Sequence, residues 1–207
     1  MLQPEWQVTA DVSAVWLAGG HVEDEYKSAG VHVGLWLRHR VGWGDVKKFQ
    51  TGLGVTYARA NGDPLYNYET PTLIDCPVDS RIDILGIVVP FGQTLWQHEG
   101  KSYFLWSVGP GIYRVHETAE IDFSEMDDGE VVRTGRRTDS MTGWRGGVDV
   151  KIGMKGMAWG MIPIGASGGI GLIRWKPHQV QSMTLDWLDT NWLMRGYFGV
   201  SVGYSTP

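Results

Sequence analysis

Cysteine is almost absent from this sequence: Cys76 is the single one in 207 residues. One cysteine excludes an internal disulfide and any zinc site built from several cysteines. Long apolar runs are absent too, because no stretch approaches the roughly 18 residues that a transmembrane helix needs. No apolar segment with a basic start opens the chain, so we expect either a cytosolic protein or one whose signal peptide has been removed.

Positive charge is also scarce, since 18 Lys and Arg stand against 23 Asp and Glu, a formal net charge of −5. This balance argues against nucleic acid as a partner. The histidines show no spacing typical of metal ligands, and no glycine-rich phosphate loop is present, so we expect neither a metal nor a cofactor. Abundant instead are glycine, with 29 residues, and tryptophan, with 11. The length suits one domain, and we expect residues 1–207 to form it.

Apolar residues alternate with small or polar ones along most of the chain, which is typical of β-strands with two different faces. The alternation is clearest in five segments: 6–16, 30–43, 49–60, 142–154 and 191–204. Three further runs are strand-like, near 81–96, 102–116 and 159–175. Each of these three contains a proline, and we expect bulges there. The register of the run near 81–96 stays open, because its middle is apolar on both faces.

The connections between these eight predicted strands alternate between long and short, at about 12, 5, 20, 4, 25, 4 and 15 residues, as in a transmembrane β-barrel. The sequence therefore predicts an all-β fold: an eight-stranded antiparallel up-and-down transmembrane β-barrel with short periplasmic turns and long extracellular loops. A soluble lipocalin-like carrier barrel is the alternative, and its apolar face would point inward.

The composition of the two faces favours the membrane. The polar face is rich in Gly, Ser and Thr, which suit a narrow barrel interior, whereas a face in water usually carries many Lys and Glu. The apolar face spans about 10 residues per strand, enough for a tilted strand to cross a bilayer. Aromatic residues lie near the ends of this face, as interfacial girdles require: Trp6, Trp16, Trp43, Phe49, Tyr57, Trp144, Trp192 and Tyr204.

The last predicted strand contains Tyr197, Gly199, Val202 and Tyr204, and Ser205-Thr206-Pro207 follows. With this pattern and the eight alternating segments, the chain resembles the small eight-stranded outer-membrane β-barrels of Gram-negative bacteria, which include the transmembrane domain of outer-membrane protein A. In that family such a pattern is the C-terminal assembly signal. The resemblance covers nearly the whole chain. It implies a location in the outer membrane, among lipid and lipopolysaccharide, and a non-enzymatic structural or surface-interaction role through extracellular loops.

Charged residues are predicted on the inward face of the barrel. Buried charges are costly unless they are paired, so we expect an internal salt-bridge network around two acids. A narrow pore for small anions is the alternative, because cations outnumber acids inside. The predicted network consists of Asp11, Arg38, Arg40, Arg145, Asp149, Lys151 and Arg195, and His32 and Trp36 lie on the same face.

Three arginines stand at the outer ends of strands predicted to run outward, in the lipid-facing register: Arg59, Arg114 and Arg174. A guanidinium at that height can reach the head groups and matches phosphate geometry. We hypothesise that these arginines contact phosphates of lipopolysaccharide. Generic anchoring at the interface is the alternative.

The longest predicted loop, 118–142, begins acidic and then turns basic. Such a run is usually a solvated surface, and a divalent-cation site or docking to a protein partner or lipopolysaccharide is the alternative. The second predicted loop, 61–80, offers Tyr66 and Tyr68 for stacking on sugars or proteins. The charges of the longest loop are Glu120, Asp122, Glu125, Asp127, Asp128, Glu130, Arg133, Arg136 and Arg137.

An outer-membrane enzyme that modifies lipid A or phospholipid is the alternative function. Residue types for acyl transfer occur near the outer rim, namely His116, Glu117, Ser124 and His178. Their spacing resembles no known lipid-modifying family, so we assign no catalytic residue and expect no enzymatic activity. His21 and His98 are most simply solvated loop residues.

Overall fold

The computed structural model describes residues 6–18, 30–41, 49–62, 68–70, 73–98, 102–158, 162–174 and 192–205. Nearly all of these residues belong to β-strands. The strands are β1 (Trp6–Ala18), β2 (Gly30–Val41), β3 (Phe49–Gly62), β4 (Tyr68–Thr70), β5 (Leu73–Val88), β6 (Phe91–His98), β7 (Ser102–Asp127), β8 (Glu130–Ala158), β9 (Ile162–Ile173) and β10 (Leu193–Ser205). No described segment is a helix long and apolar enough to cross a membrane.

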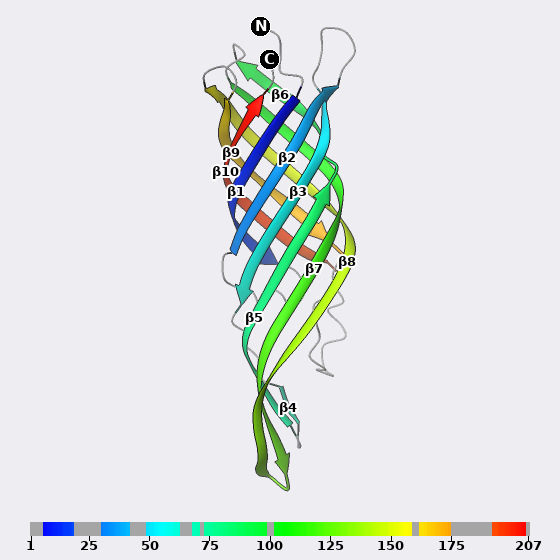
Figure 1. Ribbon diagram of the computed structural model, residues 1–207, viewed down its shortest axis with the longest axis vertical. Helices are drawn as coiled ribbons and strands as arrows, with labels where there is room; N and C mark the ends of the chain where they lie inside the picture. The colour runs from blue at the N-terminus through cyan, green and yellow to red at the C-terminus, as the bar shows by residue number, and fades with distance from the viewer. Residues whose placement is uncertain are drawn as a thin grey trace.

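These strands close into a ring of eight, all antiparallel (Figure 1). β5 and β6 act as one interrupted strand, because both pair with β3 on one side and with β7 on the other. The ring closes where β1 pairs with β10, from Gln7 opposite Ser205 to Ala18 opposite Met194. β1 therefore begins and β10 ends at the same rim. The predicted all-β, eight-stranded antiparallel barrel is confirmed.

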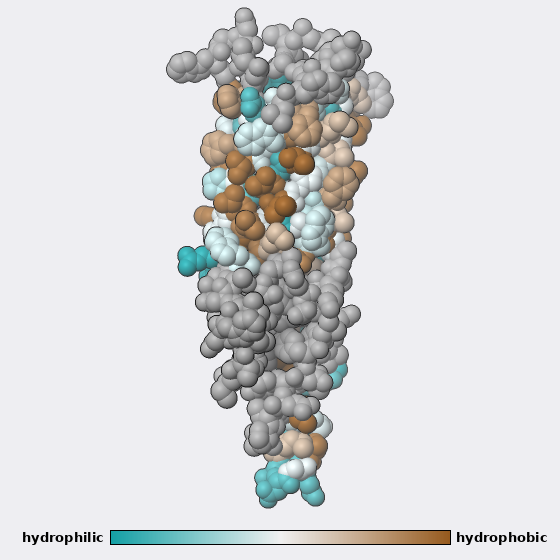
Figure 2. All heavy atoms as spheres, turned by 180° about the vertical axis from the view of Figure 1, so that it is seen from behind, coloured by the Kyte–Doolittle hydropathy of each residue, from teal (hydrophilic) through white to brown (hydrophobic). Residues whose placement is uncertain are grey.

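The outer wall of the ring is apolar. Along β2, for example, Val31, Val33, Leu35 and Leu37 are exposed, whereas the residues between them are buried. Figure 2 shows apolar side chains over the barrel wall and hydrophilic ones at the far tip of the molecule. This confirms that the apolar face points outward, not into the lumen as a lipocalin-like barrel would require. Exposed aromatic residues at or next to the strand ends include Trp6, Trp16, Phe49, Trp192 and Tyr204. Trp144 is exposed too but lies in the middle of β8, and Trp43 lies outside the described residues.

The interior is filled by its own side chains. Trp36 is 1% exposed and lies against the inward side of β3. A Cβ atom on Gly54 would stand 2.3 Å from its ring, so this position of β3 requires glycine. Small inward residues thus leave the space that large ones occupy, as expected for an eight-stranded barrel.

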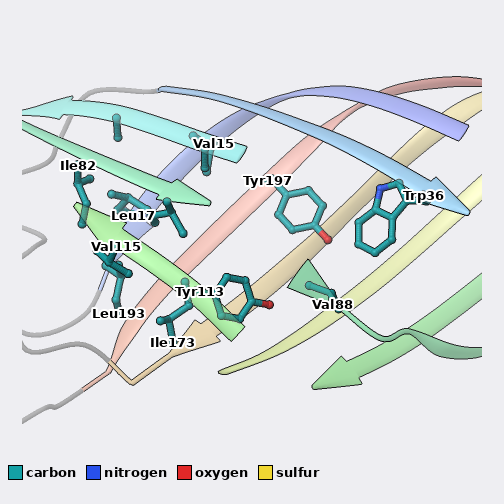
Figure 3. Packing of buried hydrophobic residues seen from close by; sticks show 13 residues of the cluster. Val15, Leu17, Trp36, Ile82, Val88, Tyr113, Val115, Ile173, Leu193 and Tyr197 are labelled. Carbon is teal, nitrogen blue, oxygen red and sulfur yellow. The ribbon is translucent and has the colours of Figure 1, made fainter. Parts of the chain in front are cut away.

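One end of the interior is a mainly apolar layer, contributed by six strands of the ring, and the buried acid Glu117 of β7 lies opposite Ile82 of this layer. Figure 3 shows several of these side chains gathered together, with Tyr113, Tyr197 and Trp36 farther along the barrel. The layer lies toward the rim opposite the one where β1 begins. Its members are Val15, Leu17, Ala58, Ala60, Ile82, Ile84, Val115, Ile173 and Leu193.

The strand near 81–96, whose register the sequence left open, keeps strict alternation in the structure. Ile82, Ile84 and Val88 point inward, and Leu85 and Ile87 point outward. Bulges were predicted in the three less regular strands, and one of the three, the run near 81–96, has a register shift, although not at its proline. The register of the neighbouring strands continues unchanged across Pro90, Pro110 and Pro163, and Pro90 interrupts the strand without shifting it. The shifts lie elsewhere, between Pro77 and Asp79, Thr94 and Trp96, and Glu125 and Met126.

The predicted long loop over 118–142 is wrong, because this segment is a β-hairpin. β7 and β8 stay paired from Ser102 opposite Gly156 to Asp127 opposite Glu130. Asp128 and Gly129 make the turn with φ of 47° and 81°, the left-handed conformation that suits Asp-Gly in a tight hairpin. The predicted second loop is likewise partly strand, since β4 and the first part of β5 lie within it.

Candidate functional site

Two buried ion pairs cross the lumen. Lys151 on β8 is hydrogen-bonded to Asp11 on β1, and both side chains are fully buried. Arg195 on β10 donates to Asp149 on β8 at 2.8 Å between Nη2 and Oδ2. The second carboxylate also accepts a hydrogen bond from the Tyr197 hydroxyl at 2.6 Å. Each acid therefore neutralises one cation from a strand that is not its direct neighbour in the barrel. This pairing limits the free-energy cost of burying the charges.

Aromatic rings surround these cations. The Nζ atom of Lys151 lies 4.6 Å from the centre of the Trp36 ring, and the guanidinium of Arg195 lies 5.0 Å from that of Tyr113. His32 stacks on Tyr197 with 4.4 Å between ring centres. These contacts add cation–π attraction to the ion pairs and fix the positions of the charges.

The structure brings most of the predicted lumen residues together but leaves one outside. Arg38 and Arg40 on β2 are buried. Arg145 is exposed, and it donates to the carbonyl of Trp144. Its position has the inward register of β8, but β9 pairs with β8 only from Gly147 onward, so Arg145 lies beyond the closed ring.

At the rim opposite the start of β1, Arg59 lies beside the acid Asp83 of the neighbouring strand, with 2.7 Å between Nε and Oδ1. The same carboxylate contacts Arg81 at 3.1 Å and accepts from the Tyr57 hydroxyl at 2.5 Å. Two guanidinium groups thus share one carboxylate, and both are about half exposed. This part of the rim carries surplus positive charge that faces outward.

The other two rim arginines lie farther around the same side of the barrel. Arg114 on β7 stands between Leu85 and Trp144 of the adjacent strands and is exposed. Arg174 follows β9, is exposed, and its backbone N–H donates to the carbonyl of Gly146 at 3.0 Å. The arginines therefore stand on β3, on β7 and just past β9, near the edge of the apolar wall that faces the β7–β8 hairpin.

Beyond the rim, the acidic residues of β7 pair with the basic residues of β8. Arg136 donates to both carboxylate oxygens of Asp122, at 2.6 and 3.0 Å, and its Nη1 lies 3.8 Å from Glu120. Arg133 lies 3.7 Å from Glu125. These hydrogen bonds lower the pKa of Asp122 and raise the pKa of Arg136, because each favours the charged form of its group. The division into an acidic half and a basic half thus reflects the antiparallel pairing of the two strands.

The residues considered for catalysis are not assembled. His116 lies within β7, where its Nδ1 contacts the Thr142 hydroxyl at 2.6 Å and its Nε2 the Thr118 hydroxyl at 3.2 Å. Ser124 is eight positions farther along the same strand, about 26 Å away at 3.3 Å per residue. Glu117 faces the opposite side of the strand from His116, because adjacent residues alternate. His178 and His21 lie outside the described residues, as does Tyr66.

No group of three or more His, Cys, Asp or Glu side chains with the geometry of a metal site occurs in the part of the chain that the structure describes. The acids of the hairpin are spread along β7 and face arginines, so they do not converge on one point.

Sequence reasoning missed two features of the site. Lys155 is 1% exposed in the lumen, but it lies one position past the segment 142–154 that was recognised as a strand. The short polar chain of Gln7, Tyr103 and Ser205 was missed as well; Gln7 contacts the Tyr103 hydroxyl at 2.6 Å and the Ser205 hydroxyl at 3.1 Å. Continued alternation beyond position 154 was the available signal for Lys155.

A closed ring of eight antiparallel strands with an apolar outer wall and a plugged, charged lumen defines a small outer-membrane β-barrel. The wall is apolar where it would meet lipid, and two ion pairs are buried in the lumen. The described strands therefore form a barrel whose apolar wall suits insertion in a membrane.

Among solved structures, the chain is similar to Ail, the attachment invasion locus protein of Yersinia pestis, at 12% identity over 99% of this chain and 100% of that one, with a TM-score of 0.47. It is similar to Neisserial surface protein A (NspA), at 12% identity over 98% and 97% of the chains and a TM-score of 0.48. CarO of Acinetobacter baumannii is 11% identical over the whole of both chains, with a TM-score of 0.39. At this identity the likeness concerns the fold alone. No family model matches the chain, and no curated protein matches it.

Proposed function

We propose that this barrel is a non-enzymatic surface protein whose extended β7–β8 hairpin meets a partner outside the cell, with the whole chain acting as one barrel domain. The observation that supports this most is the length of the hairpin. The pairing of β8 with β9 ends at Gly147, whereas its pairing with β7 continues to Glu130. Residues 130–146 therefore extend along β8 for roughly 55 Å at 3.3 Å per residue.

The hairpin is held as a sheet rather than as a solvated loop. β5 pairs with β7 out to Leu73 opposite Glu125, and β4 adds a further short strand. Figure 1 shows these strands continuing past the barrel to a narrow tip. An ordered projection loses little conformational entropy when it binds, which favours recognition of a partner.

The edge of this sheet suits a protein partner. Within the described residues, β8 from 130 to 146 pairs with a strand on one side only. An unpaired strand edge presents N–H and C=O groups that an extended segment of a partner can bind. Exposed Val131 and Val132 add apolar area close to the tip.

The test is a chain in which residues 121–137 are replaced by a two-residue Asn-Gly turn, so that Glu120 and Thr138 stay opposite each other. Surface binding is then measured on whole bacteria against host-cell and serum components. We expect the shortened barrel to fold, with loss of whichever binding the parent shows. The matched control reverses one cross-strand pair, Asp122→Arg with Arg136→Asp, and should keep the hairpin. Binding that survives removal of the hairpin would contradict the proposal.

We also propose that Arg59, Arg114 and Arg174 contact phosphates of lipopolysaccharide. All three are exposed at the edge of the apolar wall, and Arg59 shares one carboxylate with Arg81, so positive charge remains available to a phosphate. The experiment is to purify the parent and the triple Arg→Gln variant from the same membranes and to measure the lipopolysaccharide that accompanies each. We expect clearly less lipopolysaccharide with the triple variant than with the parent. Equal amounts of lipopolysaccharide would contradict the proposal and leave generic anchoring at the interface as the role of the arginines.

A further inference from the structure

An arginine outside the predicted set completes a cationic cluster at the rim. Arg81 of β5 and Arg59 of β3 contact different oxygens of the Asp83 carboxylate, each through its Nε atom, at 3.1 and 2.7 Å. The Tyr57 hydroxyl donates to the same carboxylate. Asp83 thus binds the Nε side of both guanidinium groups, and each group has further N–H donors for another acceptor.

Arg114 stands beside these residues on the same outward face. It lies on β7 opposite Leu85, and His116, two positions farther along β7, lies opposite Asp83. Residues in such diagonal positions have Cα atoms about 7–8 Å apart, which is within reach of an arginine side chain. Arg114 is exposed and forms no ion pair within the part of the chain that the structure describes. The rim cluster, as we define it, consists of Arg59, Arg81, Arg114 and Asp83.

The rim cluster has a surplus of positive charge, because three guanidinium groups surround one carboxylate and two positive charges stay uncompensated. The next acids on this face, Asp79 and Glu120, lie opposite each other farther from the apolar wall. Among the described residues, neither of them forms an ion pair with an arginine of the cluster. A phosphate monoester carries a charge of about −1.5 to −2 at neutral pH, and arginine matches its geometry bidentately. The cluster therefore suits a phosphate monoester in charge and in hydrogen bonding.

The apolar wall of the barrel begins directly beside the rim cluster. On β5, Leu85 and Ile87 follow Asp83 along the outward face, and on β7, Ile112 lies two positions before Arg114. Leu85, Ile87 and Ile112 are all exposed. A molecule whose phosphate lies at the cluster can therefore bury apolar chains against this wall, which favours a lipid over a soluble phosphate.

We propose that the rim cluster binds the phosphate monoester of one lipid. Its three guanidinium groups donate hydrogen bonds to the phosphate oxygens, and the acyl chains lie over Leu85 and Ile112. This inference rests on the proposed contact of Arg59 and Arg114 with lipopolysaccharide phosphates. It assigns both arginines to a single phosphate and adds Arg81 as the third donor.

The probe is short-chain phosphatidic acid, whose phosphate is a monoester, and short-chain phosphatidylglycerol, a diester with one charge, is the comparison. Native mass spectrometry of the full chain in detergent micelles counts the bound lipids and gives their dissociation constants. We expect one phosphatidic acid to bind about tenfold more tightly than phosphatidylglycerol. Equal affinity for the two lipids would overturn the proposal.

Arg81→Gln tests the arginine that this inference adds. It should weaken the binding of phosphatidic acid about tenfold, because it removes charged hydrogen bonds to the phosphate. Arg133→Gln is the matched control, since Arg133 is exposed on the hairpin and lies near Glu125, and it should leave the binding unchanged. An unchanged dissociation constant in Arg81→Gln would overturn the proposal.

Inorganic phosphate distinguishes a lipid headgroup from a free anion. Inorganic phosphate at millimolar concentration should not displace phosphatidic acid, and displacement would overturn the assignment of a lipid.

The lipopolysaccharide that accompanies Arg81→Gln separates this inference from the proposed function. A loss in the triple Arg→Gln variant with a parental amount in Arg81→Gln would overturn this inference alone. Parental amounts in both variants, with weaker binding of phosphatidic acid in Arg81→Gln, would contradict the role in lipopolysaccharide binding and support the lipid-phosphate site.

Discussion

Arg195 shows how single residues stabilise this lumen. It is fully buried, it is bound to Asp149, and its guanidinium also lies 3.4–3.5 Å from the Thr56 hydroxyl of a strand across the barrel. A buried charge left without its partner destabilises a protein far more than the intact pair stabilises it. The changes in the free energy of unfolding caused by the two single substitutions at this pair should therefore not sum to that of the double substitution.

We predict that Arg195→Met lowers the free energy of unfolding by about 3–5 kcal/mol, because it leaves the carboxylate of Asp149 buried without its cation. Urea-induced unfolding in lipid vesicles, followed by tryptophan fluorescence, measures this. The double variant Arg195→Met with Asp149→Asn should recover part of the loss, because neither charge then stays alone. Strictly additive losses would show that the pair is not coupled.

A second prediction at this scale concerns pH. The pKa of Asp122 lies below its unfolded value because Arg136 donates hydrogen bonds to it. The pair therefore stabilises the hairpin above the unfolded pKa, and this contribution is lost as pH falls through the folded pKa. An NMR titration of the Asp122 carboxyl should show the lowered pKa. It should rise in Arg136→Gln and stay unchanged in Arg133→Gln; identical titrations in the parent and Arg136→Gln would contradict the pairing.

At the scale of elements, β8 passes through two environments. Val150 is exposed on the outer wall of the barrel, and Val131 is exposed near the tip of the hairpin. The first side chain faces lipid and the second faces water, although both belong to one continuous strand. The same substitution at the two positions therefore separates the two surroundings.

We predict that Val150→Arg destabilises the barrel by about 2–4 kcal/mol in lipid vesicles, because it places a charge in the hydrocarbon. Val131→Arg is the matched control and should change stability by less than about 0.5 kcal/mol, as surface substitutions do. Reversible unfolding of both variants beside the parent gives the comparison. Equal effects at the two positions would place Val150 in water.

The strands inside the membrane were predictable, and the hairpin outside it was not. In the bilayer, one face must be apolar, so β1, β2, β3 and β10 show their alternation in sequence. Outside it, the first half of β8 shows no apolar period of two. β7 keeps one, with Ala119, Ile121 and Phe123 between polar residues, and this signal was missed. Two further signals were present: Asp128-Gly129, which favours a tight hairpin turn, and the acidic half followed by a basic half.

The lumen was predictable in part for the same reason. Alternation alone placed Asp11, Asp149, Lys151 and Arg195 inward, because each lies within a strand whose outer face is apolar. Which acid binds which cation depends on strands that are far apart in sequence, such as β1 and β8, and no local pattern encodes that. Arg145 was wrongly predicted to lie in the lumen. Its place depends on where β9 stops pairing with β8, which the sequence around Arg145 does not show.

For the molecule as a whole, the apolar layer bears on conduction. Val15, Leu17, Ile82, Val115 and Leu193 are each at most 5% exposed and close the lumen near the extracellular rim. The packed apolar side chains leave an ion no water of hydration here, and the acid Glu117 is itself buried beside Ile82.

We therefore predict that the purified barrel produces no single-channel conductance in planar bilayers. Leu17→Ser with Leu193→Ser should loosen the layer and raise the ion leak of loaded vesicles, whereas Leu35→Ser, on the outer wall, should not. Regular conductance steps from the parent would show that the layer does not close the lumen.

The central claim is that the chain crosses the outer membrane as a closed barrel with its apolar face in lipid. The most direct measurement is to express the chain with a signal peptide, isolate outer membranes, and compare unboiled with boiled samples on a gel. The account predicts recovery in the outer-membrane fraction and a band whose mobility shifts on boiling, because a closed barrel resists detergent until it is heated. A protein recovered in solution without detergent, with the same mobility before and after boiling, would contradict it.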